Sequence, residues 1–238
     1  GQTKNAVCTG SEVISPLLHA DKFSKDAECT NHLEKNPIIA FEKDFLRWML
    51  SDGAGAILLE NKPNDNNISL RIEWLETISF ANEMETCMYA GGEKTQSGEL
   101  LGWKNVSPEK WLKNSIFSVK QDVKLLDKNI VALGIKHLAE LCKKYQVIDS
   151  TVDYFLPHLS SMYFKQKVYD ELIKRGFEIP FEKWFTNLSQ VGNVGSASIY
   201  LILEELFHSG KLKKGETILV LVPESGRFSY AYAYMTVV

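Results

Sequence analysis

From about residue 120 to the end of the chain, segments with the spacing of helices alternate with short apolar runs typical of strands. A helix is predicted over 127–147, where apolar residues follow the i, i+4, i+7 spacing of an amphipathic helix: Val131, Ile135, Leu138 and Cys142. Two more helices are predicted over 162–176 and 196–210, each ending at a glycine. This alternation implies an α/β fold, with helices layered on a sheet.

The strand-like runs predict how this sheet is ordered. They occupy the segments 68–79, 151–156, 183–188, 216–222 and 228–238. The run ETILVLV at 216–222 has no polar alternation, as in a sheet that is covered on both faces. The last run alternates aromatic with small residues, which leaves one smooth face for the close approach of a helix. Counted from residue 68, the order is β, α, β, α, β, α, β, β, which implies a layered sheet with an antiparallel edge pair.

The first 67 residues contain two strand-like runs, 6–10 and 54–60, which resemble the pair of strands predicted at the end of the chain. The turn cluster NKPNDNN at 61–67 follows and marks a boundary. Gly1 has the character of a helix-ending glycine without its helix. We therefore expect residues 1–67 to be the C-terminal part of one α/β half, and residues 68–238 to be a complete second half.

Composition argues against several classes of protein. The 238 residues are 45% hydrophobic and 24% charged, which is typical of a globular chain with ample core. The net charge of −3 does not favour nucleic-acid binding, and no apolar run approaches the roughly 18–20 residues of a membrane span. The cysteines lack the spacing of a metal site: Cys8, Cys29, Cys87 and Cys142. We expect a cytoplasmic protein with free thiols, without metal, cofactor, nucleic acid or membrane as a partner.

Two short motifs stand where a strand or a helix changes direction. FLPHLSS at 155–161 ends a strand-like run in Pro157 and then presents His158, at the carboxyl end of a strand, where α/β proteins bind ligands. QVGNVGSAS at 190–198 opens a helix and contains Asn193, near unpaired N–H groups and a dipole that favour negative charge. Both residues are therefore candidates for a site.

With these motifs the sequence resembles the β-ketoacyl-acyl-carrier-protein synthase III branch of the thiolase superfamily. The segments that carry the resemblance are SDGAGAILLE (51–60), FLPHLSS, VGNVGSAS (191–198) and VPESGRFSY (222–230). The resemblance implies a layered αβαβα fold built from two similar βαβαβαββ halves, and a homodimer. It also implies that His158 and Asn193 are catalytic.

The two residue types suit that chemistry. Two neutral donors aimed at one thioester oxygen would stabilise the enolate formed when a malonyl-type thioester loses CO₂, and each such donor is worth about 10²–10³ in rate. Burial would keep His158 neutral. The alternatives are a structural histidine and a GNVGSAS loop that only packs a helix start, in which Gly195 and Ser196 are packing residues. For DGAGA, a strand-turn role is preferred over a phosphate cradle, because the G-x-G-x-x-G spacing is absent.

The turn PESGRFSY at 223–230 lies between the last two predicted strands. The resemblance implies that a backbone N–H of this turn helps to form an oxyanion hole, and by position the donor is Gly226 or Arg227. Many relatives have glycine where Arg227 stands, so the choice between the two stays open. An ordinary hairpin turn is the alternative.

The resemblance also implies a cysteine nucleophile at the start of a buried helix in the first half. Cys8 lies in a predicted strand, Cys29 and Cys142 have no supporting context, and Cys87 in the long segment 84–118 is the only conceivable substitute. We therefore expect no nucleophile in this chain, and a nucleophilic cysteine upstream of residue 1 in a remainder that completes the fold.

Substrates and partners follow from the resemblance in the same way. It implies thioesters of acyl carrier protein or coenzyme A, with Lys165 and Lys167 as carrier-binding candidates, whereas the basic run 211–216 is interpreted as a solvated loop. The segment 84–118 is expected to shape a tunnel for a long or unsaturated acyl chain, as in the aryl-polyene or dialkylresorcinol condensing enzymes.

The predicted function is a Claisen condensation of an acyl thioester with a malonyl- or 3-oxoacyl-type thioester, in fatty acid or polyketide biosynthesis. Two alternatives stay open: a non-catalytic thiolase-fold partner subunit, and an acyltransferase that forms no carbon–carbon bond.

Overall fold

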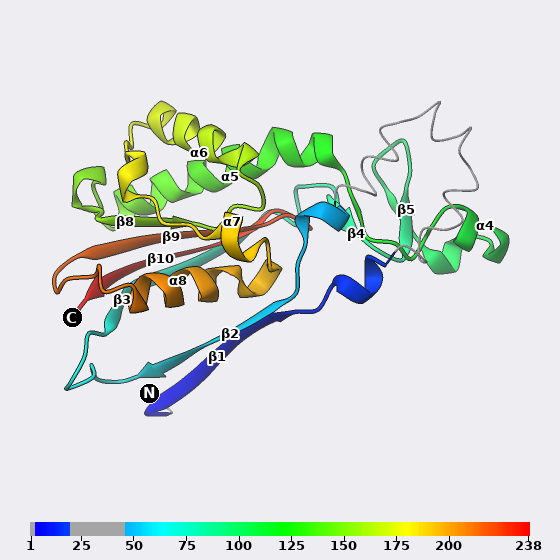
Figure 1. The fold of residues 1–238 in the computed structure, drawn as a ribbon. Coiled ribbons are helices and arrows are strands. Elements are labelled where there is room, and N and C mark those ends of the chain that lie inside the picture. Colours follow the sequence, from blue (N-terminus) through cyan, green and yellow to red (C-terminus); the bar gives the residue numbers. More distant parts are fainter. Residues whose placement is uncertain (1–2, 20–45) are drawn as a thin grey trace.

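The computed structural model describes residues 3–19 and 46–238. Its main sheet has four strands in the order β3-β10-β9-β8 (Figure 1). β10 pairs antiparallel with both β3 and β9, and β8 pairs parallel with β9. The bounds of these strands are β3 (Leu70–Ser79), β8 (Tyr154–Pro157), β9 (Thr217–Glu224) and β10 (Ser229–Val237). The antiparallel pairing of the last two strands is confirmed, but the pair lies in the middle of the sheet and not at its edge.

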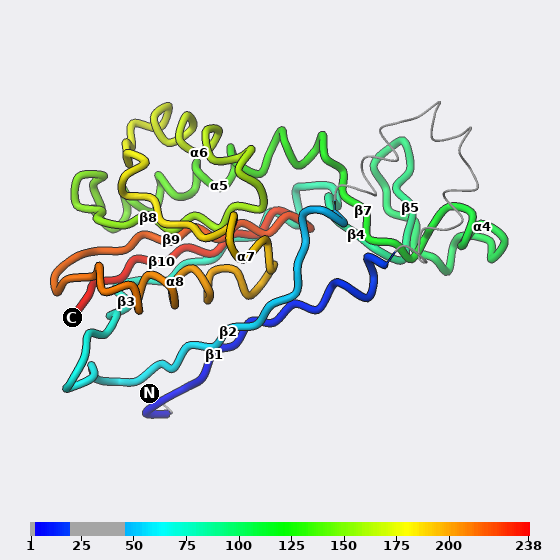
Figure 2. Tube along the Cα trace, in the orientation of Figure 1, coloured from blue at the N-terminus to red at the C-terminus, as the bar shows by residue number. Residues whose placement is uncertain are grey.

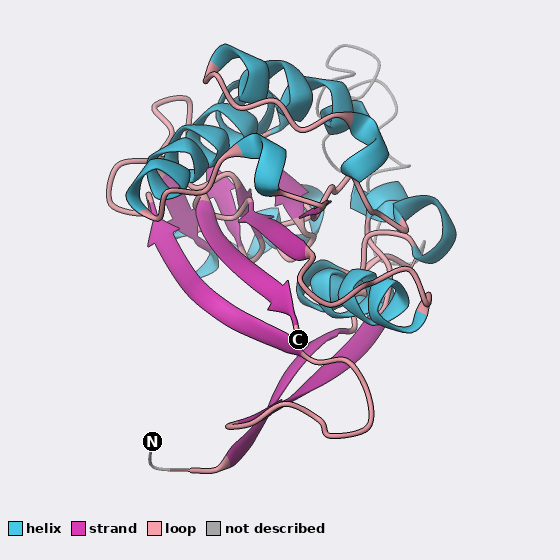
Figure 3. Cartoon of the chain, turned by 90° about the vertical axis from the view of Figure 1, so that its left-hand side faces the viewer, coloured by secondary structure: helices cyan, strands magenta, loops and turns pink. Residues whose placement is uncertain are grey.

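Helices cover both faces of this sheet. α5 (Val123–Lys144) and α6 (Tyr163–Lys174) lie on one face, and α8 (Ser198–His208) lies on the other (Figures 1 and 3). β1 (Asn5–Glu12) and β2 (Gly53–Glu60) form an antiparallel ribbon on the far side of α8, as the trace in Figure 2 shows. The layers are therefore helices, sheet, helix and ribbon, in the order that an αβαβα fold requires.

The buried residues form one cluster on each face of the main sheet. In β9, Leu219 and Leu221 pack toward α5 and α6, whereas Ile218 and Val220 pack toward α8. Because both faces are covered, the strand needs no polar side of its own. This explains the uninterrupted apolar run at 216–222.

β10 shows why its aromatic and small residues alternate. The hydroxyls of Tyr230 and Tyr232 donate to the carbonyls of Ile130 and Gly134 on α5, each at 2.9 Å. Gly134 leaves room for this contact, since a Cβ there would lie 2.6 Å from the Tyr230 ring. On the opposite face, Ala233 packs in the cluster that contains α8.

Two segments differ from simple strands and loops. Residues 183–188 do not form the predicted strand: Trp184 makes an isolated parallel bridge with Phe155, between η5 (Phe181–Lys183) and α7 (Leu188–Val191). The segment between β3 and α5, here called the excursion, contains small elements of its own. They are β4 (Met88–Tyr89), β5 (Gly92–Lys94), β6 (Leu100–Gly102), η3 (Trp103–Asn105), α4 (Pro108–Lys113) and β7 (Lys120–Gln121).

Three further short 3-10 turns complete the described elements: η1 (Ser15–Leu17), η4 (Asp149–Thr151) and η6 (Gly195–Ala197). Gly1 and Cys29, on which predictions were made, lie outside the described residues. Within the described residues, no helix is both long and apolar enough to cross a membrane.

Candidate active site

His158 and Asn193 lie at the same edge of the main sheet. His158 follows β8 directly, and its backbone N–H donates to the Leu221 carbonyl of β9 at 2.8 Å, so that the parallel pairing continues past the strand. α8 leads into β9 and runs antiparallel to it, as crossover helices do. The start of α8, which Asn193 precedes, therefore lies at the carboxyl edge of β8 and β9, as Figure 1 shows.

The strand that His158 follows also packs against the helix that follows Asn193. Leu156 of β8 lies in the cluster that contains Ile202 of α8. Because the chain enters α8 shortly after Asn193, the topology brings an imidazole and a carboxamide to the same edge of the sheet.

The imidazole of His158 is buried and neutral. His158 is 9% exposed, and burial lowers the pKa of its imidazole from 6.5 to about 4. No residue that the structure describes hydrogen-bonds to its ring, so one N–H and one lone pair can serve a ligand. Beside it, a cavity of about 30 Å³ is lined by Gly134, Phe164 and Tyr230, among others. This space can hold a water molecule and lies toward α5 and α6, and Asn193 does not line it.

The carboxamide of Asn193 is buried, and its orientation is set. Its Oδ1 accepts the Gly195 N–H at 3.1 Å, and its backbone carbonyl accepts the Ser51 N–H at 2.8 Å. Gly192 precedes it with a φ of +78°, and a Cβ there would lie 2.7 Å from Ser51 Oγ. Among the described residues nothing accepts a hydrogen bond from Nδ2. The amide is therefore turned so that its N–H₂ group can donate to a ligand.

The ribbon of β1 and β2 holds the loop that carries Asn193. Ser196 Oγ donates to the Ser11 carbonyl at 3.1 Å, and its backbone N–H donates to Glu12 Oε2 at 3.2 Å. Gly55 lets α8 lie directly on the ribbon, since a Cβ there would be 2.3 Å from the Tyr200 Cβ. The packing role predicted for Ser196 is confirmed. Residues 53–56 of DGAGA lie within β2, so the strand part of its predicted strand-turn role is confirmed, whereas the turn is not formed.

The turn between β9 and β10 lies at this same edge. The Gly226 N–H donates to the Glu224 carboxylate, and the Gly226 carbonyl accepts the Cys87 N–H at 2.8 Å. Arg227 Nη1 donates to the Ala81 carbonyl at 3.4 Å. The Glu224 carboxylate thus already accepts the Gly226 N–H. An oxyanion that binds this N–H would first have to displace the carboxylate. No sequence motif singles out Glu224.

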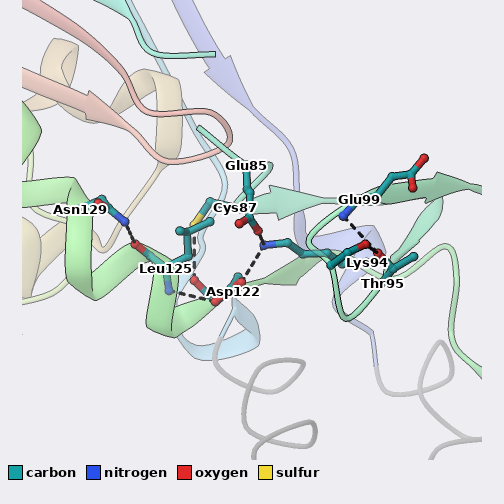
Figure 4. A network of polar contacts seen from close by, with 9 residues as sticks. Glu85, Cys87, Lys94, Thr95, Glu99, Asp122, Leu125 and Asn129 are labelled. Carbon is teal, nitrogen blue, oxygen red and sulfur yellow. Dashed lines mark hydrogen bonds and ion pairs between the residues drawn. The ribbon is translucent and has the colours of Figure 1, made fainter. Parts of the chain in front are cut away.

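Cys87 is unsuited to be a nucleophile. It is fully buried, and its Sγ donates to the Asp122 carbonyl at 3.4 Å (Figure 4). Burial, assisted by the Asp122 charge, raises its pKa to about 12. Cys142 is also buried, which raises its pKa to about 12, and Cys8 lies exposed on β1. A reactive thiolate needs the opposite, acidifying surroundings, so the substitute role considered for Cys87 is not supported.

A half-buried lysine fixes the base of the excursion at the edge. Lys94 Nζ contacts Glu85 Oε2 at 2.9 Å and Asp122 Oδ2 at 2.8 Å (Figure 4). Asp122 also caps α5, since its Oδ1 accepts the Leu125 N–H at 2.9 Å. Gln121 Nε2 donates to Ser225 Oγ at 2.9 Å. The excursion is therefore attached to the turn between β9 and β10, next to the candidate site.

The two carrier-binding candidates have partners within the chain. Lys165 Nζ lies 4.6 Å from the Phe181 ring centroid, and Lys167 Nζ contacts Asp127 Oδ1 at 2.5 Å. α6 begins shortly after His158, so both lysines are near the site edge. The basic run 211–216 precedes β9 and lies at the opposite edge. In the described part of the chain, no group of three or more His, Cys, Asp or Glu side chains could hold a metal ion.

The layered architecture is that of the thiolase-like condensing enzymes. The 3-oxoacyl-[acyl-carrier-protein] synthase III of Aquifex aeolicus has this fold with a TM-score of 0.64, at 19% identity, over 98% of this chain and 58% of the other. A structure of OleA from Xanthomonas campestris has a TM-score of 0.69 at 18% identity, over 99% of this chain and 57% of the other. The tetronic acid condensing enzyme AbyA1 has a TM-score of 0.66 at 15% identity, over 99% of this chain and 60% of the other.

Within that class, residues 142–233 match the family described as 3-oxoacyl-[acyl-carrier-protein (ACP)] synthase III C terminal. The chain is 25% identical over 221 residues to a β-ketoacyl-[acyl-carrier-protein] synthase III of Clostridium perfringens, covering 93% of this chain and 56% of the relative. The corresponding protein of Aquifex aeolicus is 25% identical over 235 residues, covering 93% and 62%. These matches relate the chain to the synthase III family, and it spans little more than half the length of these relatives.

Proposed function

We propose that this chain supplies the hydrogen-bond donors of a synthase III-type condensing enzyme, which joins an acyl thioester to a malonyl- or 3-oxoacyl-type thioester. The observation that carries the proposal is the placement of His158 and Asn193 at one edge of the sheet. Both are buried, the imidazole is neutral, and the Asn193 oxygen is already bonded to Gly195. The similarity to β-ketoacyl-[acyl-carrier-protein] synthase III of Clostridium perfringens supports acyl-carrier-protein chemistry.

The reaction can be followed from the donors. In a malonyl-type thioester, the bond to the carboxylate breaks, CO₂ leaves, and the electron pair becomes an enolate. An N–H of His158 and the Nδ2–H of Asn193 donate to the enolate oxygen and lower its energy. The enolate carbon then attacks the acyl thioester carbonyl, and the thiolate of that thioester leaves. With a 3-oxoacyl donor, the enolate forms by loss of a proton instead. We propose that the acyl group is carried by a cysteine that is neither Cys87 nor Cys142.

The substrates and the acyl site are proposed from their position at the same edge of the sheet. Carrier-protein or coenzyme A thioesters would enter near Lys165 and Lys167, at the same edge as His158. The excursion would form one wall of the acyl site, because its base is attached to the turn that holds Gly226. A long or unsaturated chain, as in the aryl-polyene or dialkylresorcinol condensing enzymes, fits an excursion of this length. We also propose that the active form is a homodimer.

The donor role can be tested without the nucleophile. Enolate formation from malonyl-coenzyme A needs only the donors, and protonation of the enolate by water then gives acetyl-coenzyme A. We expect His158→Ala and Asn193→Ala each to lower CO₂ release by about 10²–10³-fold. His137→Ala, on α5 beside Glu140, is the matched control and should release CO₂ at the wild-type rate. Wild-type rates in either donor variant would contradict the proposal.

Product mass separates the alternatives. After incubation with acyl and malonyl thioesters, condensation gives a 3-oxoacyl chain longer by two carbons. An acyltransferase that forms no carbon–carbon bond gives only a transferred acyl group or free acid. A non-catalytic partner subunit gives no product. A strict preference for acetyl-coenzyme A as the acyl substrate would contradict the long-chain assignment.

A further inference from the structure

The excursion ends in an exposed aromatic tip, defined here as residues 103–117. The Trp111 ring lies 5.4 Å from that of Trp103 and 5.9 Å from that of Phe117, both edge to face. Trp111 Nε1 donates to the Val106 carbonyl at 2.8 Å, which holds the cluster in place. Around this fixed ring, apolar side chains face outward: Leu112 is 70% exposed, Phe117 50% and Trp103 40%.

The charge of the tip is opposite to that of the whole chain. It contains three lysines, Lys104, Lys110 and Lys113, against the single acid Glu109, whereas the 238 residues carry a net charge of −3. All four charged residues are exposed. Lys104 Nζ also lies 5.7 Å from the centroid of the Trp103 ring. Apolar and cationic groups thus share one small surface.

The tip is also a protrusion. Figure 1 shows α4 at one end of the molecule, beyond β5 and away from the main sheet and the helices that cover it. A protrusion of this kind can bury only a few side chains, whereas a standard protein interface buries roughly 800 Å² on each partner. A bilayer surface requires less: a few aromatic and aliphatic side chains enter the headgroup region, while lysines contact anionic lipids.

We propose that the tip docks on the surface of an anionic membrane, with Leu112, Phe117 and Trp103 in the headgroup region and the three lysines on lipid phosphates. This is peripheral binding, and it departs from the expectation of no membrane partner, which rested on the lack of a spanning segment. It does not depend on the proposed function, because the tip shares no residue with His158, Asn193 or the turn at Gly226.

The test measures binding of the protein to vesicles by co-sedimentation. Vesicles of phosphatidylcholine alone are compared with vesicles that contain phosphatidylglycerol, at low and high salt. We expect binding to the anionic vesicles, weakened by salt. Each lysine near such a surface is worth about fivefold in partitioning, so Lys110→Ala with Lys113→Ala should lower it about 30-fold. Lys213→Ala with Lys214→Ala, at the opposite edge of the sheet, is the charge-matched control.

A second pair of variants tests the apolar contribution. Leu112→Ser with Phe117→Ser should abolish binding, whereas Ile148→Ser, which alters a 56% exposed residue after α5, should leave it unchanged. Circular dichroism shows which variants are folded. The proposal is overturned if the folded wild-type protein does not bind anionic vesicles, if the tip variants bind as well as the controls, or if the tip binds an acidic protein but no lipid.

Discussion

A His158→Gln variant tests whether burial keeps the imidazole neutral in the folded protein. Glutamine retains a polar side chain that cannot titrate. The pKa of His158 falls from 6.5 to about 4 on folding, because the charged ring loses its water. Between these two values the unfolded chain binds a proton that the folded chain does not. The free energy of unfolding must therefore decrease as the pH falls through this window.

The size of the effect follows from the shift. One pKa unit corresponds to about 1.4 kcal/mol, and a single group with these two pKa values makes the protein about 2 kcal/mol less stable at pH 5 than at pH 7.5. The loss approaches about 3 kcal/mol at pH 4. Other groups contribute their own pH dependence, but they contribute equally to the wild type and the variant. The difference between the two curves therefore isolates His158.

The assay is urea unfolding followed by tryptophan fluorescence, at steps between pH 7.5 and pH 4.5. The wild type should lose stability relative to His158→Gln by the amounts given above, and the loss should begin near pH 6.5. An NMR titration of the imidazole provides the direct check. Parallel stability curves for the two proteins, or an imidazole that titrates near 6.5 in the folded state, would refute the claim that His158 is a neutral donor at pH 7.

The other predictions concern packing and thiol chemistry. Gly55→Val should lower the free energy of unfolding by about 1–3 kcal/mol, because even a Cβ there would lie 2.3 Å from the Tyr200 Cβ. Ala54→Val, on the exposed face of β2, is the control and should change the melting temperature little. Equal melting temperatures for the two variants would contradict the close packing. Cys8 should react quickly with maleimide at pH 8 whereas Cys87 should react only after unfolding, because its thiol is buried with a pKa of about 12. Mass spectrometry of the labelled peptides measures both rates, and fast labelling of Cys87 in the folded chain would show that the excursion opens.

The alternation of helices and strands was predictable because each element has a local signal. α5 and α6 repeat their apolar residues at helical spacing, and β9 is apolar throughout because both of its faces are covered. The strand predicted at 183–188 failed for a reason that the local sequence does not show. Only Trp184 and Phe185 reach the edge of β8, at Phe155, between two short helical turns.

For the candidate site, the sequence supplied the residue types and the structure supplied their arrangement. That His158 follows a strand and Asn193 precedes a helix could be predicted from proline, glycine and the apolar pattern around them. That both reach one edge depends on the direction of the crossover, which is a property of the assembled sheet.

Contacts between residues far apart in the chain were decided by the tertiary structure alone. Ser51 fixes the carbonyl of Asn193, Cys87 holds the turn at Gly226, and Lys94 joins Asp122. No local pattern marks these pairs, because a hydrogen bond or ion pair depends on distance in space. The sequence determined which elements form, and the packing of those elements determined which side chains meet and which remain able to bind a ligand.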